Sequence, residues 1–152
     1  MAETSATQNL REVKSCGFFV MKPDNSFLLM KHDDRYDLPK GHMEAGENEH
    51  QTALRELMEE TGIQASDIDI DPHFRFEHVY YPVYKRFGGE QVKKTVVIFL
   101  AKLKSTAIEV HISEHPGFQW VNWSSPPVPI EAKTIDKLVN KVHEYLTQSK
   151  DE

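Results

Sequence analysis

The chain has 152 residues, of which 39% are hydrophobic and 28% charged, and a formal net charge of −6 at pH 7. This length and composition predict a single globular domain, and the negative charge argues against broad binding along a nucleic-acid backbone, so we expect no DNA binding. With a single cysteine, no apolar run long enough to span a membrane and no secretory signal, we expect a cytoplasmic protein without a disulfide or a membrane anchor.

Composition divides the chain into three parts. Residues 1–12 are polar and are expected to form a flexible N-terminal leader, residues 13–148 a single domain, and residues 149–152 a flexible tail. No internal repeat or low-complexity linker interrupts the domain.

The first elements predict a β-hairpin followed by a loop. Residues 15–21 form an apolar run typical of a strand, and residues 27–30 predict the returning strand. The sequence Lys-Pro-Asp-Asn between them favours a turn. Residues 32–36 are polar and predict a loop, which leads into Asp-Leu-Pro-Lys-Gly-His at residues 37–42.

The segment at residues 37–42 combines a rigid residue with a permissive one. Pro39 restricts the backbone, and Gly41 allows it to pass close to a ligand or a metal ion. Lys40 and His42 are either ordinary loop residues in water or contacts for phosphate oxygens. Because they precede a cluster of carboxylates, we expect them to bind substrate.

An amphipathic helix is predicted within residues 41–63. Asn48 is the expected N-cap, and Gly62 stands where a helix ends in a left-handed residue. A rotation of about 100° per residue places one apolar stripe toward the core, formed by Leu54, Leu57 and Met58.

The same helix carries a wedge of carboxylates. Glu56, Glu59 and Glu60 fall within one sector, and Arg55 can pair with Glu59 at i+4. Three neighbouring like charges repel one another, and a divalent cation held by oxygen ligands would remove that repulsion. The alternative is a solvated acidic helix, which explains some of these glutamates but not the arginine, both glycines and every spacing together.

The second half predicts three strands and a closing helix. Residues 74–84 are rich in aromatic side chains and predict a strand, residues 93–103 a strand covered on both faces, and residues 118–121 a further strand. Residues 134–147 predict an amphipathic helix whose apolar stripe packs on the core.

The segment from residue 41 to residue 63 resembles the Nudix box, G-x5-E-x7-R-E-aliphatic-x-E-E-x-G-aliphatic, with no departure. The matching residues are Gly41, Glu47, Arg55, Glu56, Leu57, Glu59, Glu60, Gly62 and Ile63. The resemblance implies an α/β fold, a Nudix-type α/β/α sandwich with a mixed β-sheet between helices. It also implies hydrolysis of a nucleoside diphosphate linked to another group.

The resemblance further implies a site for Mg²⁺ (or Mn²⁺) at which water is activated. It makes Glu56 and Glu60 metal ligands beside Gly41, and Glu59 either a third ligand or the group that activates water. Arg55 would orient the glutamates, and Glu47 would support the loop. Many Nudix enzymes use one more glutamate from a later loop. Here that candidate is Glu114, in Ser-Glu-His-Pro-Gly-Phe-Gln-Trp.

Further motifs resemble the animal- and archaeal-type asymmetric diadenosine tetraphosphate hydrolases. These are Pro-Lys-Gly-His before the box, the Glu114 segment, and Lys94 in Lys-Thr-Val, where the branch has a phosphate-binding lysine. Phe118 stands where the branch commonly has a tyrosine that stacks on adenine. A second departure is Tyr-Asp-Leu at residues 36–38, in place of a histidine-tryptophan pair.

This resemblance implies an enzyme that binds a small nucleotide and cuts diadenosine tetraphosphate asymmetrically to ATP and AMP. We expect a monomer. We expect Tyr80 or Tyr81 and Phe118 to sandwich one adenine, with Lys40 and Lys94 along the phosphates. Alternatives are another Nudix substrate, namely a damaged or free nucleoside triphosphate, an RNA 5′ end or an inositol pyrophosphate, and a non-catalytic nucleotide-binding module. The acidic chain disfavours RNA and inositol pyrophosphates, and the complete box disfavours a non-catalytic module.

Overall fold

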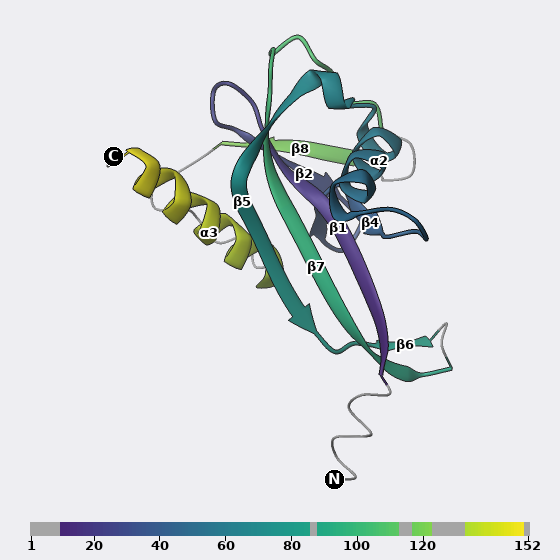
Figure 1. The fold of residues 1–152 in the computed structure, drawn as a ribbon. Helices are drawn as coiled ribbons and strands as arrows, with labels where there is room; N and C mark the ends of the chain where they lie inside the picture. The colour runs from purple at the N-terminus through teal and green to yellow at the C-terminus, as the bar shows by residue number, and fades with distance from the viewer. Residues whose placement is uncertain (1–9, 86–87, 113–116, 123–132, 151–152) are drawn as a thin grey trace.

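The computed structural model describes residues 10–85, 88–112, 117–122 and 133–150. Figure 1 shows a twisted sheet with one helix on each side. The elements in chain order are β1 (Arg11–Met21), β2 (Phe27–Lys31), β3 (Tyr36–Asp37), β4 (Lys40–His42), α2 (Glu49–Thr61), the 3-10 turn η1 (Ala65–Asp67), β5 (Ile68–Tyr80), β6 (Val83–Tyr84), β7 (Glu90–Leu103), β8 (Gly117–Val121) and α3 (Lys133–Lys150).

The sheet is mixed and is built around β1 and β7. These two strands run parallel, and their pairing extends without interruption from Arg11 opposite Val92 to Met21 opposite Lys102. On one side β5 pairs antiparallel with β7, and on the other β2 and β4 both pair antiparallel with β1. β3 and β8 extend the sheet from β2.

The predicted hairpin is confirmed, because β1 and β2 pair antiparallel with Met21 opposite Phe27. Asn25 has φ 71°, a left-handed conformation that asparagine tolerates in turns. β1 starts at Arg11, four residues before the predicted start, because pairing with β7 stabilises its polar end as a strand. The segment Lys40–His42, predicted as an approach loop, is the short strand β4 for the same kind of reason.

Two apolar clusters lie on opposite faces of the sheet, which confirms the α/β/α sandwich. One joins Phe18, Val97 and Phe99 to Ala53 and Leu57 of α2. The other joins the alternating strand residues Phe19, Ile98 and Leu100 to the apolar stripe of α3, which consists of Ile135, Leu138, Val139 and Val142. Within the described residues, no helix is both long and apolar enough to cross a membrane.

The predicted caps of the box helix are confirmed, but its predicted apolar stripe is partly wrong. Asn48 is the N-cap of α2, and Gly62 ends the helix with φ 77°. Leu57 is fully buried and Leu54 packs partly on the core, whereas Met58 is 47% exposed. The buried line runs through Ala53, Leu57 and Thr61 at i, i+4 and i+8, which turns Met58 toward solvent.

Candidate active site

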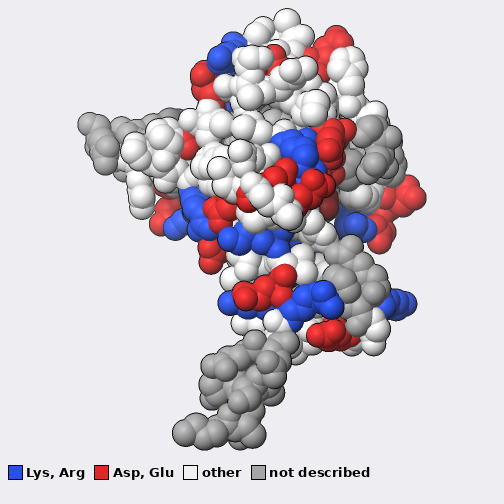
Figure 2. Space-filling model, turned by 45° about the vertical axis from the view of Figure 1, so that its right-hand side comes forward, with Lys and Arg blue, Asp and Glu red and all other residues white. Residues whose placement is uncertain are grey.

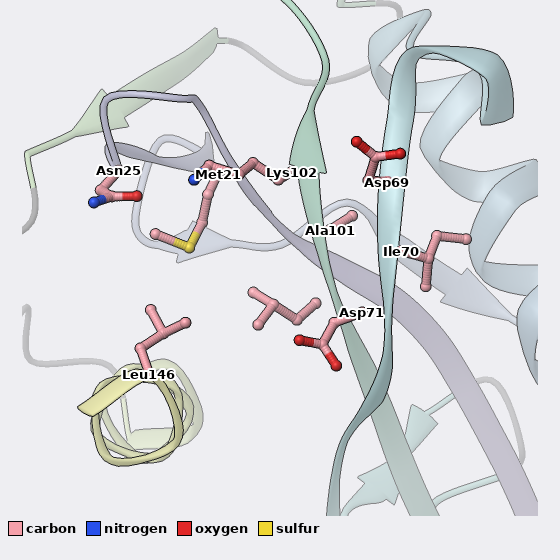
Figure 3. A pocket seen from close by; sticks show the side chains of 9 residues that line it. Met21, Asn25, Asp69, Ile70, Asp71, Ala101, Lys102 and Leu146 are labelled. Carbon is pink, nitrogen blue, oxygen red and sulfur yellow. The ribbon is translucent and has the colours of Figure 1, made fainter. Parts of the chain in front are cut away.

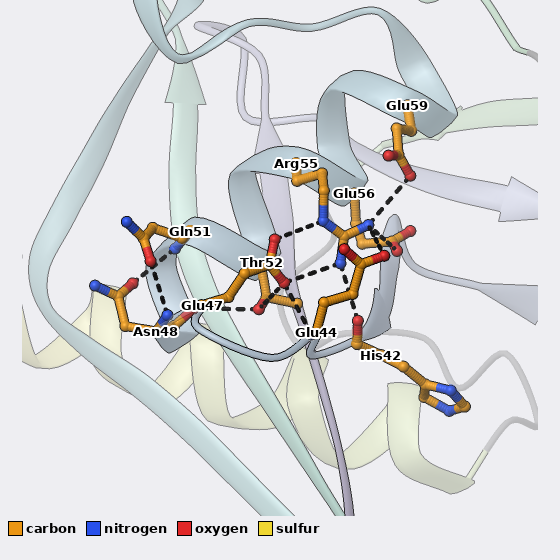
Figure 4. Close-up of polar contacts among 9 residues, drawn as sticks. All are labelled: His42, Glu44, Glu47, Asn48, Gln51, Thr52, Arg55, Glu56 and Glu59. Carbon is orange, nitrogen blue, oxygen red and sulfur yellow. Dashed lines mark hydrogen bonds and ion pairs between the residues drawn. The ribbon is translucent and has the colours of Figure 1, made fainter.

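Arg55 is the centre of the polar contacts around the box helix (Figure 4). Its Nε donates to Glu47 Oε2 at 2.6 Å and its Nη2 donates to Glu47 Oε1 at 3.0 Å, which is a bidentate pair. Nη2 also donates to the carbonyl oxygen of His42 at 2.9 Å. One guanidinium therefore fastens the loop between β4 and α2 to the helix.

The third guanidinium nitrogen of Arg55, Nη1, binds two carboxylates of the wedge. Nη1 donates to Glu56 Oε1 at 2.9 Å and to Glu59 Oε2 at 3.3 Å, so the predicted pairing of Arg55 with Glu59 is confirmed. The hydrogen bonds to Glu47, and after them the contacts with Glu56, raise the pKa of Arg55. Arg55 in turn lowers the pKa of Glu47 to about 2, so Glu47 is ionised in the folded protein at neutral pH.

Glu47 also links the loop before α2 to the first turn of the helix. Its Oε1 accepts from the Glu44 backbone N–H at 3.0 Å and from the Thr52 hydroxyl at 2.8 Å. Next to it, the Asn48 side chain accepts from the Gln51 N–H, and the Gln51 side chain accepts from the Asn48 N–H, which is a capping box. The start of the helix is therefore fixed in place from both sides.

Gly41 lets the Glu56 carboxylate reach the sheet. A Cβ atom built on Gly41 would overlap the carboxylate carbon and both carboxylate oxygens of Glu56. The Glu56 side chain is only 16% exposed, and Oε2 of Glu60 is buried, whereas the Glu59 side chain is 51% exposed. The three carboxylates of the predicted wedge thus sit in different environments.

The oxygen donors of this region suit a hard divalent cation. Mg²⁺ takes one or two carboxylates together with water and substrate phosphates, so it needs no complete protein cage. Glu56 and Glu60 could supply such carboxylates, and the absence of a side chain at Gly41 keeps Glu56 at the sheet. Among the described residues, no three His, Cys, Asp or Glu side chains converge as a preformed metal cluster. Glu114 lies outside the described residues.

Four predicted substrate residues lie on one face of the sheet. Directly paired strand residues point to the same face, and residues two apart on one strand do so too. Ser15 of β1 pairs with His42, and Gly17, two residues on, pairs with Lys40. Val13, two residues before Ser15, pairs with Lys94, which pairs with Tyr80. The resulting set, Lys40, His42, Lys94 and Tyr80, lies opposite the α2 face.

The Cα hydrogens of Gly41 face α2 instead. Gly41 pairs with Cys16, whose side chain belongs to the apolar cluster under α2. The Glu56 carboxylate and the four substrate candidates are therefore on opposite sides of the sheet, and of the four only Lys40 and His42 lie on β4 with Gly41. Of the aromatic candidates, Tyr80 is 37% exposed and Tyr81 49% exposed. The Tyr80 ring also stacks on His78, with 5.5 Å between centroids.

The structure separates Tyr80 from Phe118, two members of the expected adenine sandwich. Phe118 lies in strand β8 and pairs with Met30, whose side chain belongs to the α2-face cluster. Tyr80 points to the α3 face. The sheet order β8-β2-β1-β7-β5 also separates Phe118 from Tyr80 by four strand spacings, about 19 Å. Two rings so placed cannot enclose one base.

The lysine candidates have partners in the described part of the chain. Lys40 Nζ lies 3.1 Å from Asp37 Oδ1, and both side chains are mostly buried. Lys94 Nζ lies 5.7 Å from the centroid of the Tyr84 ring, within the range of a cation–π contact. Figure 2 shows basic and acidic side chains interleaved on the face in view, with no broad field of one sign there.

Sequence reasoning missed two residues of this region, Asp37 and Gly17. A Cβ atom on Gly17 would overlap the Pro39 carbonyl oxygen and the Lys40 side chain, so a glycine in β1 is what admits β4. An isolated glycine inside a strand pattern is a known signal of such an approach. For Asp37 the only signal was its position three residues before Lys40.

A hollow of about 250 Å³ lies elsewhere in the described structure (Figure 3). It is bordered by Met21, Leu100 and Leu146 with Asp71 and Lys102, at the carboxyl end of β1. β4 and Gly41 pair with the middle of β1 instead. The Tyr145 hydroxyl donates to both oxygens of Asp71, at 2.9 and 3.1 Å, and so joins α3 to β5 beside the hollow.

Comparison with known proteins assigns the family. The NUDIX domain model matches residues 12–141. The chain belongs to the Nudix family. It is 33% identical over 147 residues to the bis(5′-nucleosyl)-tetraphosphatase [asymmetrical] of Mus musculus, with 88% of this chain and 95% of that protein covered. The Sus scrofa protein of the same name is 32% identical with the same coverage.

A solved structure of a C. elegans Ap4A hydrolase in a binary complex is also similar. It superimposes with a TM-score of 0.74 at 26% identity and covers 90% of this chain and 98% of that one. These likenesses confirm the Nudix fold and make this chain a Nudix hydrolase. Nudix hydrolases in general need a divalent metal ion.

Proposed function

We propose that this Nudix hydrolase cuts a dinucleoside tetraphosphate, diadenosine tetraphosphate in particular, asymmetrically to ATP and AMP. Support comes from the mammalian relatives, which carry the name bis(5′-nucleosyl)-tetraphosphatase [asymmetrical], and from the similar Ap4A hydrolase structure. Both likenesses extend over nearly the whole chain rather than over the box alone.

The observation that carries the proposal is the shared face of Lys40, His42, Lys94 and Tyr80, with Glu56 reaching the sheet at Gly41. Three strand spacings and four residues separate Lys40 from Tyr80, which is roughly 20 Å. A single phosphate cannot contact both ends of such a row. A long polyphosphate chain with a base at one end can, which favours a dinucleoside tetraphosphate over a smaller nucleotide.

Glu56 and Glu60 would hold the divalent ion, Mg²⁺ or Mn²⁺, with Glu59 as a third ligand or as the base for water. When bound, this ion neutralises phosphate charge and lowers the pKa of the attacking water. Arg55 keeps Glu56 and Glu59 oriented through its hydrogen bonds. Glu114 remains our candidate for a further ligand.

On the opposite face, Lys40, His42 and Lys94 would contact phosphate oxygens. Tyr80 would stack on one adenine from a single side, backed by His78, and Tyr81 is the alternative platform. Lys94→Met should raise KM about tenfold or more, since a charged hydrogen bond is lost, without a change in the unfolding temperature. An unchanged KM would mean that Lys94 does not contact the substrate phosphates.

Hydrolysis of diadenosine tetraphosphate in ¹⁸O-labelled water tests the proposal. Attack at the phosphorus farthest from the bound adenosine releases AMP, so the label is expected in AMP alone, with ATP unlabelled. Label in ATP would place the attack on the other side of the cleaved bridge, and two ADP molecules would mean symmetric cleavage. Faster turnover of ATP than of diadenosine tetraphosphate would make the protein a general nucleoside triphosphate hydrolase instead.

A further inference from the structure

Asp37 is placed to control the lysine next to the proposed metal site. Lys40 Nζ lies 3.1 Å from Asp37 Oδ1 and 3.3 Å from Oδ2, so both carboxylate oxygens face one ammonium. Only 21% of the Lys40 side chain and 24% of the Asp37 side chain are exposed. Water therefore screens this pair less than an exposed surface pair.

The Asp37 carboxylate is itself held in a fixed orientation. Its Oδ1 accepts from the backbone N–H of Leu38 at 2.8 Å, and the His32 Nε2 lies 3.9 Å from Oδ2. The Lys40 backbone is equally constrained, because β4 pairs with β1 and Gly17 admits it closely. A rigid anion and a rigid backbone leave the Lys40 ammonium one preferred position in the free protein.

We propose that Asp37 is a positioning residue that acts as an internal competitor for anions at Lys40. The proposal rests on the polyphosphate site described above. In the free protein Asp37 holds the Lys40 ammonium. A phosphate that binds Lys40 must share or displace this carboxylate, so Asp37 lowers the affinity of the site for anions. The weaker binding keeps substrate and products from being held too tightly. Tight binding of the ground state would not speed the reaction, so the lower affinity favours turnover.

The test measures binding of inorganic tripolyphosphate, with Mg²⁺ and without a nucleotide, by titration calorimetry. Asp37→Asn removes the charge but keeps an oxygen that can accept from the Leu38 N–H. We expect it to bind tripolyphosphate about fivefold more tightly than the parent protein. Asp37→Ser, whose hydroxyl can also accept from Leu38, should show the same gain. Asp34→Asn is the matched control, because Asp34 lies in the loop just before β3, is exposed and pairs with Arg35, and it should leave the affinity unchanged.

A double-mutant cycle separates competition from a structural role. In a Lys40→Met background, Asp37→Asn should no longer change the affinity, because there is no ammonium to compete for. A gain that persists in this background would overturn the proposal, as would an affinity of both Asp37 variants equal to or below that of the parent. Absence of tripolyphosphate binding in the parent and in both variants overturns it too. Because no nucleotide is present, a different natural substrate would contradict the proposed function without affecting this result.

Kinetics give a second readout. With diadenosine tetraphosphate, Asp37→Asn should lower KM about fivefold and leave kcat equal to or below the parent value, since the lost competitor affects ground-state binding. A fall in kcat together with a rise in KM would instead show that Asp37 serves the site only as a structural support.

Discussion

The two faces of the sheet are stabilised by different forces. The α3 face is covered by an apolar stripe from Ile135 to Val142, which packs on strand residues such as Phe19 and Leu100. On the α2 face only Ala53, Leu57 and two threonines of the helix are buried. That helix is held instead by its caps, by Arg55 and by ion pairs of Glu49.

The comparison teaches that polar contacts take the place of apolar packing on α2. This helix carries Arg55 and the three carboxylates of the wedge, which leave few positions for the core. Its orientation then depends on hydrogen bonds and charges, which are directional and so place side chains accurately. α3 carries no such demand, and nondirectional burial is enough to hold it. The following predictions change each kind of contact separately.

The largest effect is expected from Glu60→Gln, which keeps the shape of the side chain and removes one charge that would bind metal. kcat/KM should fall by a factor of about 100 or more. Mutation of a residue that only hydrogen-bonds to a metal ligand can already cost up to this factor, and Glu60 would be a ligand itself. The unfolding temperature should stay close to that of the parent protein. Glu144→Gln, an exposed carboxylate change on α3, is the control and should leave kcat/KM intact. Retained activity in a folded Glu60→Gln protein would remove Glu60 from the metal site.

Leu138→Ala tests the apolar face. Leu138 is fully buried, so the free energy of unfolding should drop by about 2–5 kcal/mol through lost burial and a cavity. Met58→Ala on α2 should change it by less than about 0.5 kcal/mol, because Met58 is largely exposed. Urea denaturation of both variants measures the difference. Equal losses would mean that α2 relies on apolar burial as much as α3 does.

Tyr80→Ala and Phe118→Ala separate the two faces as substrate surfaces. Tyr80 shares a face with Lys40 and Lys94, so its removal should cost about 1–3 kcal/mol of nucleotide binding if it stacks on a base. Phe118→Ala should cost clearly less, since Phe118 lies on the other face and about four strands away. The KM for diadenosine tetraphosphate is measured for both variants. A larger increase of KM in Phe118→Ala than in Tyr80→Ala would mean that Phe118, and not Tyr80, stacks on the base.

The smallest effect concerns Glu49, which joins α2 to β1 through Lys14 at 2.9 Å and to β5 through Arg75 at 2.8 Å. These partners, Arg75 first, lower the pKa of Glu49 from 4.5 to about 2. A lowered folded-state pKa stabilises the protein above the unfolded-state value, and this contribution is lost as the pH falls from about 4.5 toward 2.

Glu49→Gln should therefore lower the free energy of unfolding by about 1 kcal/mol or less at pH 7. The gap between parent and variant should narrow as the pH falls below 4.5, the ordinary pKa of this side chain. Thermal unfolding across that range checks the sign. A gap that widened at low pH would contradict the assigned ion pairs.

Much of the local structure could be predicted because its signals are local. Asn48 and Gly62 mark the ends of α2 through backbone preferences that a few neighbouring residues decide. The pairing of Arg55 with Glu59 follows from helical spacing alone. The apolar stripe of α3 could be predicted as well, because a helix with one buried face has apolar residues at helical spacing.

The errors came where distant segments decide the outcome. Met58 was misplaced because the angle at which α2 meets the sheet, not the helix itself, selects the buried line. β4 was read as a loop because its strand form depends on β1, more than twenty residues earlier. Phe118 and Tyr80 were paired in the expectation because the sequence gives no sheet order, and the order places them at opposite ends.

The sequence by itself determined the family, the box helix with its caps and carboxylates, and the α/β class, since these depend on residue types at short spacings. Only the tertiary structure decided that Lys40, His42, Lys94 and Tyr80 share one face while Glu56 reaches the sheet from the other at Gly41. The physical reason is that strand register alternates side chains between two faces. Register is set by long-range pairing, which no local stretch of residues encodes.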